Sequence, residues 1–151
     1  MKKEETINDK PGGITGDVLQ AGKEIYLTEG YCKTCHQPDG KGLEASAYPP
    51  IAGSPWVLGS EERLIKLVLK GLSGPIEVNG KKYPGQVPMT PYGDLLNDEQ
   101  VAAVLTYVRN SFGNNASVVL PGTVKEVRAG IKNKVGFYTP EELLKQHPLK
   151  K

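Results

Sequence analysis

The sequence is poor in the residues that cross-link a chain or bind a metal. It has two cysteines, two histidines and two methionines, of which one is Met1. The cysteines, Cys32 and Cys35, are too few for a disulfide framework and too close together to close a long loop. We therefore expect these two residues to have a chemical role.

Long apolar runs are also missing. No segment approaches the roughly eighteen unbroken apolar residues of a membrane-spanning helix, so no transmembrane segment is predicted. The charged start of the chain, residues 1–13, has no apolar stretch behind it, and no export signal is recognisable there. Either such a signal was removed or the sequence is an engineered version of the protein, and a cleaved signal, a lipid attachment and a neighbouring domain all stay open as the missing leader.

The size and composition predict one globular domain. The chain has 151 residues, of which 38% are hydrophobic and 24% are charged, a balance that excludes a disordered polyelectrolyte. The 18 glycines and 12 prolines predict many loops and few long regular elements. A net charge of only +2 gives no support for binding to nucleic acid or to an anionic membrane.

The charge is unevenly distributed. Residues 113–151 carry seven Lys or Arg and three acidic residues, whereas residues 17–112 carry nine and eleven. This contrast predicts a mildly acidic body followed by a separate basic extension. The basic side chains of that extension either form a docking surface for an acidic partner or, as surface charges usually do, remain solvated. They include Lys125, Arg128, Lys132, Lys134 and Lys145.

Both cysteines belong to one short motif, Cys32-Lys33-Thr34-Cys35-His36. This is the spacing of c-type haem attachment. Two intervening residues in a tight helical turn place the two sulfurs so that each can add to one vinyl group on the same edge of the macrocycle. His36 then lies under the iron as proximal ligand, and its other ring nitrogen can donate to a backbone carbonyl.

Two other uses of the cysteines fit less well. A structural zinc site needs four ligands, and the only other histidine is His147, near the end of the chain. A thioredoxin-like pair needs a strand before the motif, whereas the preceding residues predict a helix. His147 lies beside Pro148 in a polar segment and is also a poor candidate for a sixth iron ligand.

Met89 is the one internal thioether. It lies in residues 85–93, a loop that Pro84, Pro88 and Pro91 should stiffen by fixing φ. Methionine most often fills a gap in a core. Downstream of a haem motif, however, a stiff loop favours a role for Met89 as the second axial ligand, which raises the reduction potential.

Three amphipathic helices are predicted around these residues. One begins near Thr15–Asp17, one is capped by Ser60, and one is capped by Asn97, which with Gln100 resembles a capping box. Between the last two, residues 76–83 predict a hairpin with a two-residue Asn-Gly turn. The apolar positions that should face the core are Val18, Ala21, Gly22, Ile25, Ile65, Val68, Leu69, Leu72, Val101, Val104, Leu105 and Val108.

These residues resemble the cytochrome c family of small single-haem domains, over about residues 17–112. The resemblance implies an all-α cytochrome c fold, with about three main helices around one covalently bound haem c. It also implies that the first helix crosses the last, with Gly22, Tyr26 and Tyr107 at the crossing. The hairpin is then a small insertion, residues 1–16 a flexible leader, and residues 113–151 a basic C-terminal extension that starts as a linker and ends in a short helix capped by Thr139.

The resemblance also implies further haem contacts. The segment 48–54 is similar to the family's proline-containing loop, in which a proline carbonyl accepts the N–H of the proximal histidine. Either Pro49 or Pro50 fits that position, and Tyr48 of the same loop is also expected to contact the haem. Trp56 and Arg63 resemble the groups that reach the haem propionates, although Trp56 could be ordinary core and Arg63 a solvated charge.

The ending of the last predicted helix, residues 105–114, closely resembles that of haem subunits serving periplasmic dehydrogenases. The implied function is electron transfer from such a dehydrogenase to another cytochrome or a terminal oxidase. The implied location is the periplasm or another extracytoplasmic space, with membrane association through a missing leader or a partner left open. Two protein ligands leave no iron position for a substrate, so an electron carrier is expected rather than an enzyme. The alternatives are a five-coordinate haem enzyme or gas sensor, and a module of a larger oxidoreductase.

Overall fold

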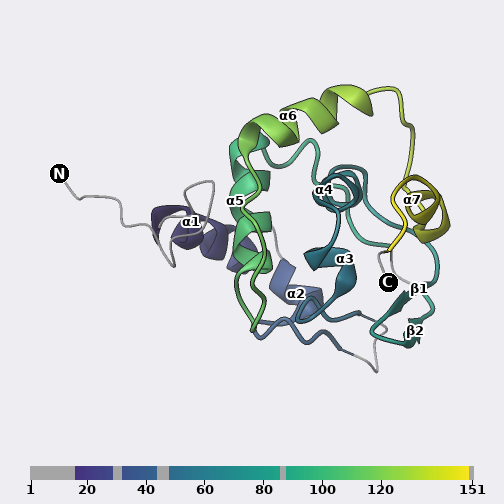
Figure 1. Ribbon diagram of the computed structural model, residues 1–151, viewed down its shortest axis with the longest axis horizontal. Helices are drawn as coiled ribbons and strands as arrows, with labels where there is room; N and C mark the ends of the chain where they lie inside the picture. The colour runs from purple at the N-terminus through teal and green to yellow at the C-terminus, as the bar shows by residue number, and fades with distance from the viewer. Residues whose placement is uncertain (1–15, 29–31, 44–47, 86–87, 150–151) are drawn as a thin grey trace.

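The computed structural model describes residues 16–28, 32–43, 48–85 and 88–149. In this part of the chain the fold is mainly helical with one small hairpin (Figure 1), which agrees with the predicted all-α class. The predicted leader lies outside the described residues except for Gly16, which begins the first helix. The elements are α1 (Gly16–Leu27), α2 (Cys32–His36), α3 (Pro55–Leu58), α4 (Glu61–Lys70), β1 (Ile76–Val78), β2 (Lys81–Tyr83), α5 (Asp98–Arg109), α6 (Pro121–Gly130) and α7 (Pro140–Gln146).

Helices α1 and α5 cross in direct contact, as predicted. Gly22 makes this possible, because a Cβ there would lie 2.6 Å from the Tyr107 Cβ and closer still to the Ala103 carbonyl oxygen. Beside the crossing, the rings of Tyr26 and Tyr107 pack 5.6 Å apart. Ala21, which was expected to face the core, is exposed, and Tyr26 is fully buried instead.

The predicted caps hold α4 and α5 in place. The Ser60 hydroxyl accepts from the Arg63 N–H, and α4 ends at Gly71, whose φ of 79° closes it. Asn97 and Gln100 form both hydrogen bonds of the capping box at the start of α5. The hairpin pairs Ile76 to Tyr83 across its Asn-Gly turn.

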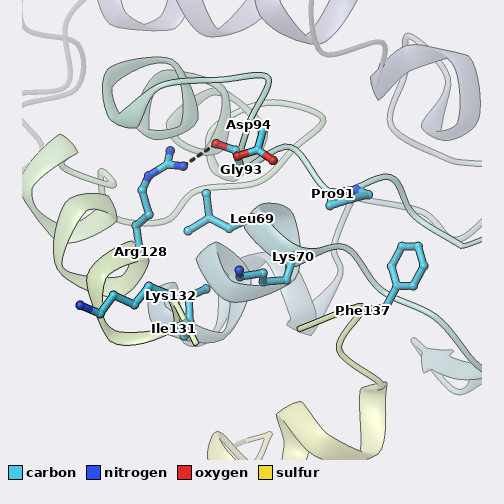
Figure 2. A pocket seen from close by; sticks show the side chains of 10 residues that line it. Leu69, Lys70, Pro91, Gly93, Asp94, Arg128, Ile131, Lys132 and Phe137 are labelled. Atoms are coloured by element: carbon cyan, nitrogen blue, oxygen red, sulfur yellow. Dashed lines mark hydrogen bonds between the residues drawn. The ribbon is translucent and has the colours of Figure 1, made fainter. Parts of the chain in front are cut away.

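The C-terminal extension packs onto the body and does not form a separate unit. Helix α6 contacts α4 and α5, helix α7 contacts α4, and Val119, Val124 and Leu143 belong to the same hydrophobic core as α1, α4 and α5. Two of its cations are bound to acidic side chains: Arg128 lies 2.7 Å from Asp98, and Lys134 lies 3.1 Å from Glu142. Figure 2 shows Arg128 also reaching the Gly93 carbonyl.

The expected linker at residues 113–117 is tightly held. The Asn114 amide is buried, donates to the carbonyls of Ile51 and Val108, and accepts from the Gly53 N–H. A side chain that satisfies three backbone groups fixes the start of the extension against the body. The short helix predicted after Thr139 is α7, with its capping box, whereas α6 was not predicted.

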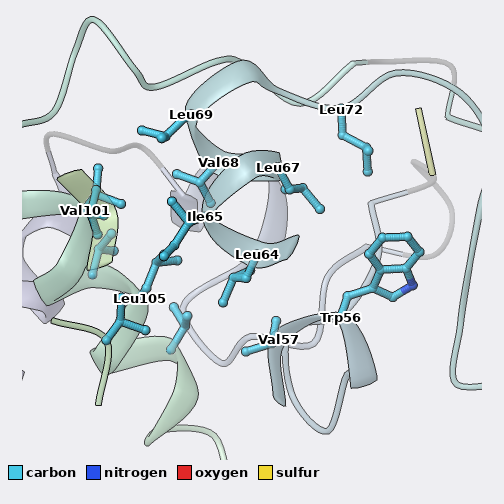
Figure 3. Close-up of a cluster of buried hydrophobic side chains, with 14 of the residues drawn as sticks. Trp56, Val57, Leu64, Ile65, Leu67, Val68, Leu69, Leu72, Val101 and Leu105 are labelled. Carbon is cyan, nitrogen blue, oxygen red and sulfur yellow. The ribbon is translucent and has the colours of Figure 1, made fainter. Parts of the chain in front are cut away.

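The core lies between α4, α5 and α3 (Figure 3). The predicted stripes of α4 and α5 are buried there, and Leu72 is buried just beyond the end of α4. Trp56 of α3 is only 4% exposed and contributes its ring to this core. In the described residues, no helix has the length and apolar character needed to cross a membrane.

Candidate functional site

The Cys-x-x-Cys-His motif forms a helix of its own, α2 (Cys32–His36). Both cysteines are half-buried, and neither is in a disulfide. Burial, with a smaller contribution from Cys35, raises the pKa of the Cys32 thiol to about 11. Cys35 raises the pKa of Tyr48 by its charge and by a hydrogen bond, so the Tyr48 phenol lies against this thiol. The two thiols are therefore on one helical turn, with a phenol beside Cys35.

His36 has a fixed tautomer. Its Nδ1 lies 2.8 Å from the Pro49 carbonyl oxygen, which can only accept, so Nδ1 carries the proton and Nε2 presents a lone pair. Burial lowers the pKa of His36, against a smaller opposite effect of this hydrogen bond. Pro49, not Pro50, supplies the acceptor, which decides the alternative that the sequence left open.

Further hydrogen bonds hold the main chain at His36 in place. Gln37 follows with a φ of 68°, and its carbonyl accepts from the Tyr26 phenol at 2.6 Å. The His36 carbonyl accepts from the Gly42 N–H at 3.0 Å. The sequence pattern assigned Tyr26 to the helix crossing and missed this second contact, because a phenol on a buried face gives no sign of its acceptor.

Met89 is anchored through its own backbone. Its N–H donates to the Leu72 carbonyl at 2.8 Å and its carbonyl accepts from the Leu72 N–H at 3.3 Å. Further along the loop, the N–H groups of Tyr92 and Gly93 donate to the carbonyls of Val68 and Leu69, which lie in the last turn of α4. The Met89 side chain is half-buried and packs against the core. Residues 86–87 of the predicted loop lie outside the described residues.

The methionine loop and the cysteine helix share one environment. Burial raises the pKa of Tyr92 to about 12, and the charges of Cys32 and Cys35 act in the same direction. A phenol three residues after Met89 is thus within electrostatic reach of both thiols. Cys32, Met89 and Tyr92 also pack against the same hydrophobic core.

Trp56 and Arg63, the expected propionate contacts, lie together with Arg63 above the indole ring at 5.1 Å. The Trp56 Nε1–H already donates to the Glu77 carbonyl at 3.1 Å, so this N–H is engaged within the protein. Arg63 is 1% exposed and donates to the carbonyls of His147 (2.8 Å) and Pro55 (2.9 Å). Its Nε is buried and has no hydrogen-bond partner. Arg63 is therefore not a solvated surface charge.

His147 lies with Arg63 rather than with the cysteine helix. Its Nε2 is 3.2 Å from the Glu62 carboxylate and 3.1 Å from the Lys66 ammonium. The structure thus engages His147 at the junction of α4 and α7, consistent with the low expectation for it as a ligand.

The residues present fit a haem c. The chain offers two thiols on one helical turn, the imidazole of His36 with its Nε2 lone pair, and the thioether of Met89 on an anchored loop. It also offers the buried guanidinium of Arg63, whose Nε–H has no hydrogen-bond partner and could donate to a carboxylate. No group of three or more metal-ligating His, Cys, Asp or Glu side chains occurs within the described ranges, so a zinc cluster has no counterpart there.

Comparisons with known proteins agree with this chemistry. A family model described as Cytochrome c matches residues 19–112. Cytochrome c-552 of Thermus thermophilus is 36% identical over 129 residues, covering 82% of this chain and 91% of that protein. The cytochrome c subunit of alcohol dehydrogenase (quinone) from Gluconacetobacter polyoxogenes is 35% identical, covering 79% of this chain and 23% of the subunit. The gluconate 2-dehydrogenase cytochrome c subunit of Pantoea cypripedii is 37% identical, with 74% and 24% covered.

Proposed function

Because the chain belongs to the cytochrome c family, we propose that His36 and Met89 are the axial ligands of its haem c. The family binds haem c covalently through a motif that this chain has at Cys32–His36, and the protein is a monohaem electron-transfer cytochrome. When bound, the group supplies an iron centre that accepts and releases one electron.

The observation that carries the assignment of His36 is the hydrogen bond from its Nδ1 to the Pro49 carbonyl. This bond leaves Nε2 as the nitrogen with a lone pair and holds the ring plane. Met89 is supported by its paired backbone and by its packing, with Cys32, against the same hydrophobic core. Thioether ligation opposite imidazole favours the reduced state and raises the potential.

Two protein ligands also define the role of the chain. With His36 and Met89 both in place, no position remains for a substrate, so the chain acts as an electron carrier and not as an enzyme. A carrier needs rigid ligands, since movement of ligands during transfer slows it. The hydrogen bond of His36 to the Pro49 carbonyl and the backbone pairing of Met89 with Leu72 supply that rigidity.

The relatives' names support a class of electron-transfer partner. Alcohol, gluconate and fructose dehydrogenases each have a cytochrome subunit similar to this chain. We propose that the electron donor is such a dehydrogenase, that the acceptor is another cytochrome or a terminal oxidase, and that transfer takes place in the periplasm or another extracytoplasmic space. This chain spans about a quarter of the alcohol and gluconate dehydrogenase subunits, so these partners are proposals on the matched part alone.

Carbon monoxide binding tests the ligand set. The reduced protein should bind carbon monoxide slowly, because Met89 must first dissociate, and the oxidised protein should show the weak near-infrared band of sulfur-to-iron charge transfer. Rapid binding together with loss of that band would support the five-coordinate enzyme or gas sensor instead.

A further inference from the structure

Arg128 joins the C-terminal extension to the methionine loop. Its guanidinium lies 2.7 Å from the Asp98 carboxylate, donates to the Leu96 carbonyl at 3.0 Å, and donates to the Gly93 carbonyl. In Figure 2 the side chain reaches from α6 across to the segment that carries Gly93 and Asp94. Arg128 lies outside the residues that the family model matches.

The turn that Arg128 contacts is the end of the Met89 loop. Gly93 is held on both sides: its N–H donates to the Leu69 carbonyl at 3.0 Å, and its carbonyl accepts from Arg128. The Tyr92 carbonyl closes the turn by accepting from the N–H groups of Leu95 and Leu96. Only three residues lie between Met89 and Gly93, so fixing Gly93 limits how far Met89 can move.

The C-terminal extension also supports the segment that pairs with Met89. The Leu72 segment, which pairs with Met89, pairs on its opposite edge with Tyr138. The Tyr138 N–H donates to the Gly71 carbonyl at 3.2 Å, and its carbonyl accepts from the Ser73 N–H at 2.9 Å. These contacts leave a cavity of about 500 Å³ between α4, the loop and α6, with Arg128 in its wall. The cavity gives the loop room to move if Arg128 is lost.

We propose that Arg128 is a positioning residue for Met89, holding the turn at Gly93–Leu96 so that the methionine remains in place as a ligand. The proposal rests on the proposed function of Met89. A guanidinium suits the task because its planar fork satisfies three acceptors in different directions at once, and Asp98 fixes its orientation. A lysine at this position could reach one acceptor at a time.

The test compares exogenous imidazole binding to the oxidised holoprotein of the wild type, Arg128→Gln and Arg128→Lys. Imidazole binds only where Met89 has dissociated, so its apparent affinity reports the dissociated fraction. Loss of charged hydrogen bonds predicts that Arg128→Gln raises the imidazole affinity about tenfold or more. Arg128→Lys should restore part of the wild-type value. An affinity for Arg128→Gln within about twofold of wild type would overturn the proposal.

Two controls separate positioning from general stability. Val119→Ala removes buried volume elsewhere in the extension and should lower the free energy of unfolding without changing imidazole affinity. An equal rise in affinity for Val119→Ala would overturn the proposal. Lys125→Gln, an exposed cation on the same helix, should leave both quantities unchanged.

Two further results distinguish this proposal from the one it rests on. If the wild type itself lacks the near-infrared band, the assignment of Met89 fails and the proposal fails with it. If the band is present, only the variants decide.

Should Arg128→Gln yield no holoprotein, Asp98→Asn removes the ion pair and keeps the guanidinium. It should raise imidazole affinity in the same direction, and no change would overturn the proposal.

Discussion

At the scale of single residues, backbone groups determine how the candidate ligands are presented. The Pro49 carbonyl fixes the tautomer of His36, and the Leu72 backbone fixes the position of Met89. The side chains of Pro49 and Leu72 take no part in these hydrogen bonds. We infer that substituting His36 or Met89 disturbs the site more than substituting Pro49 does.

Met89→Ala should lower the reduction potential, on the order of 0.1 V, because the thioether that favours the reduced state is gone. It should also allow rapid carbon monoxide binding, while both thioether links stay intact. Voltammetry measures the first effect, and haem-stained denaturing gels check the links. An unchanged potential would contradict the assignment of Met89.

Arg63→Met should lower the free energy of unfolding of the holoprotein by about 2 kcal/mol. The substitution leaves the His147 and Pro55 carbonyls without their charged donor, although it also removes the cost of burying a cation, and burial already lowers the pKa of Arg63. Urea titration measures the change, with Lys125→Gln as the control. Equal stability would show that the two effects cancel and that Arg63 is dispensable.

The structure confirms the predicted caps at Ser60, Asn97 and Thr139, each of which acts within three positions. The haem-binding roles of Cys32, Cys35, His36 and Met89 stay predictions. The choice of Pro49 and the partners of Arg63 could not be predicted, because Arg63 meets His147 across 84 positions of sequence. The propionate roles of Trp56 and Arg63 remain predictions, and the engaged Trp56 N–H does not favour the first.

At the scale of elements, the crossing of α1 and α5 depends on the close approach at Gly22. Gly22→Ala should lower the free energy of unfolding by about 2 kcal/mol, since the added methyl group meets the Ala103 carbonyl and Tyr107. Gly122→Ala in α6 is a matched control with open space around the new methyl group, so it should be neutral or slightly stabilising. Thermal denaturation of the two variants checks this, and equal effects would contradict the packing argument.

Helices α3 and α6 were not predicted, because local sequence patterns alone do not determine such short helices. Helix α3 has four residues, although Ser54 caps it and Pro55 begins it, a signal that could have been used. Helix α6 has no side-chain cap at Leu120 and contains two glycines, which disfavour a helix. Burial of Val124 and Val127 stabilises α6, and such tertiary packing leaves little trace in a ten-residue window.

At the scale of the whole molecule, the extension is part of the structure that holds the site. The charge contrast predicted a basic segment apart from the body, whereas the extension packs onto the body. Solvated or docking charges were the wrong description of Arg128 and Lys134, which bind Asp98 and Glu142. Composition cannot reveal such pairs, because the acidic partner of Arg128 lies 30 positions earlier in the sequence. The boundary between the haem domain and the extension, placed between residues 112 and 113, stays a prediction.

Acid should weaken the docking of α7. Burial and the nearby charges of Lys66 and Arg63 lower the pKa of His147 below its ordinary 6.5, although Glu62 acts in the opposite direction. The hydrogen bond from Lys134 lowers the pKa of Glu142 below its ordinary 4.5. Since the unfolded chain then binds more protons, stability is full above pH 6.5 and falls as the pH drops, first through His147 and then through Glu142. Urea unfolding of wild type and His147→Gln between about pH 7 and 5 measures this. The wild type should lose more stability over that range, and an equal loss would contradict the role of His147.

The intact mass of the denatured protein tests the central claim most directly. The chain should be produced in a host that matures c-type cytochromes and treated with a thiol-alkylating reagent. The account predicts a single species with the mass of the chain plus one haem and no alkylated thiol, because Cys32 and Cys35 are both bound. A chain that carries no haem and is alkylated at both cysteines would contradict this claim.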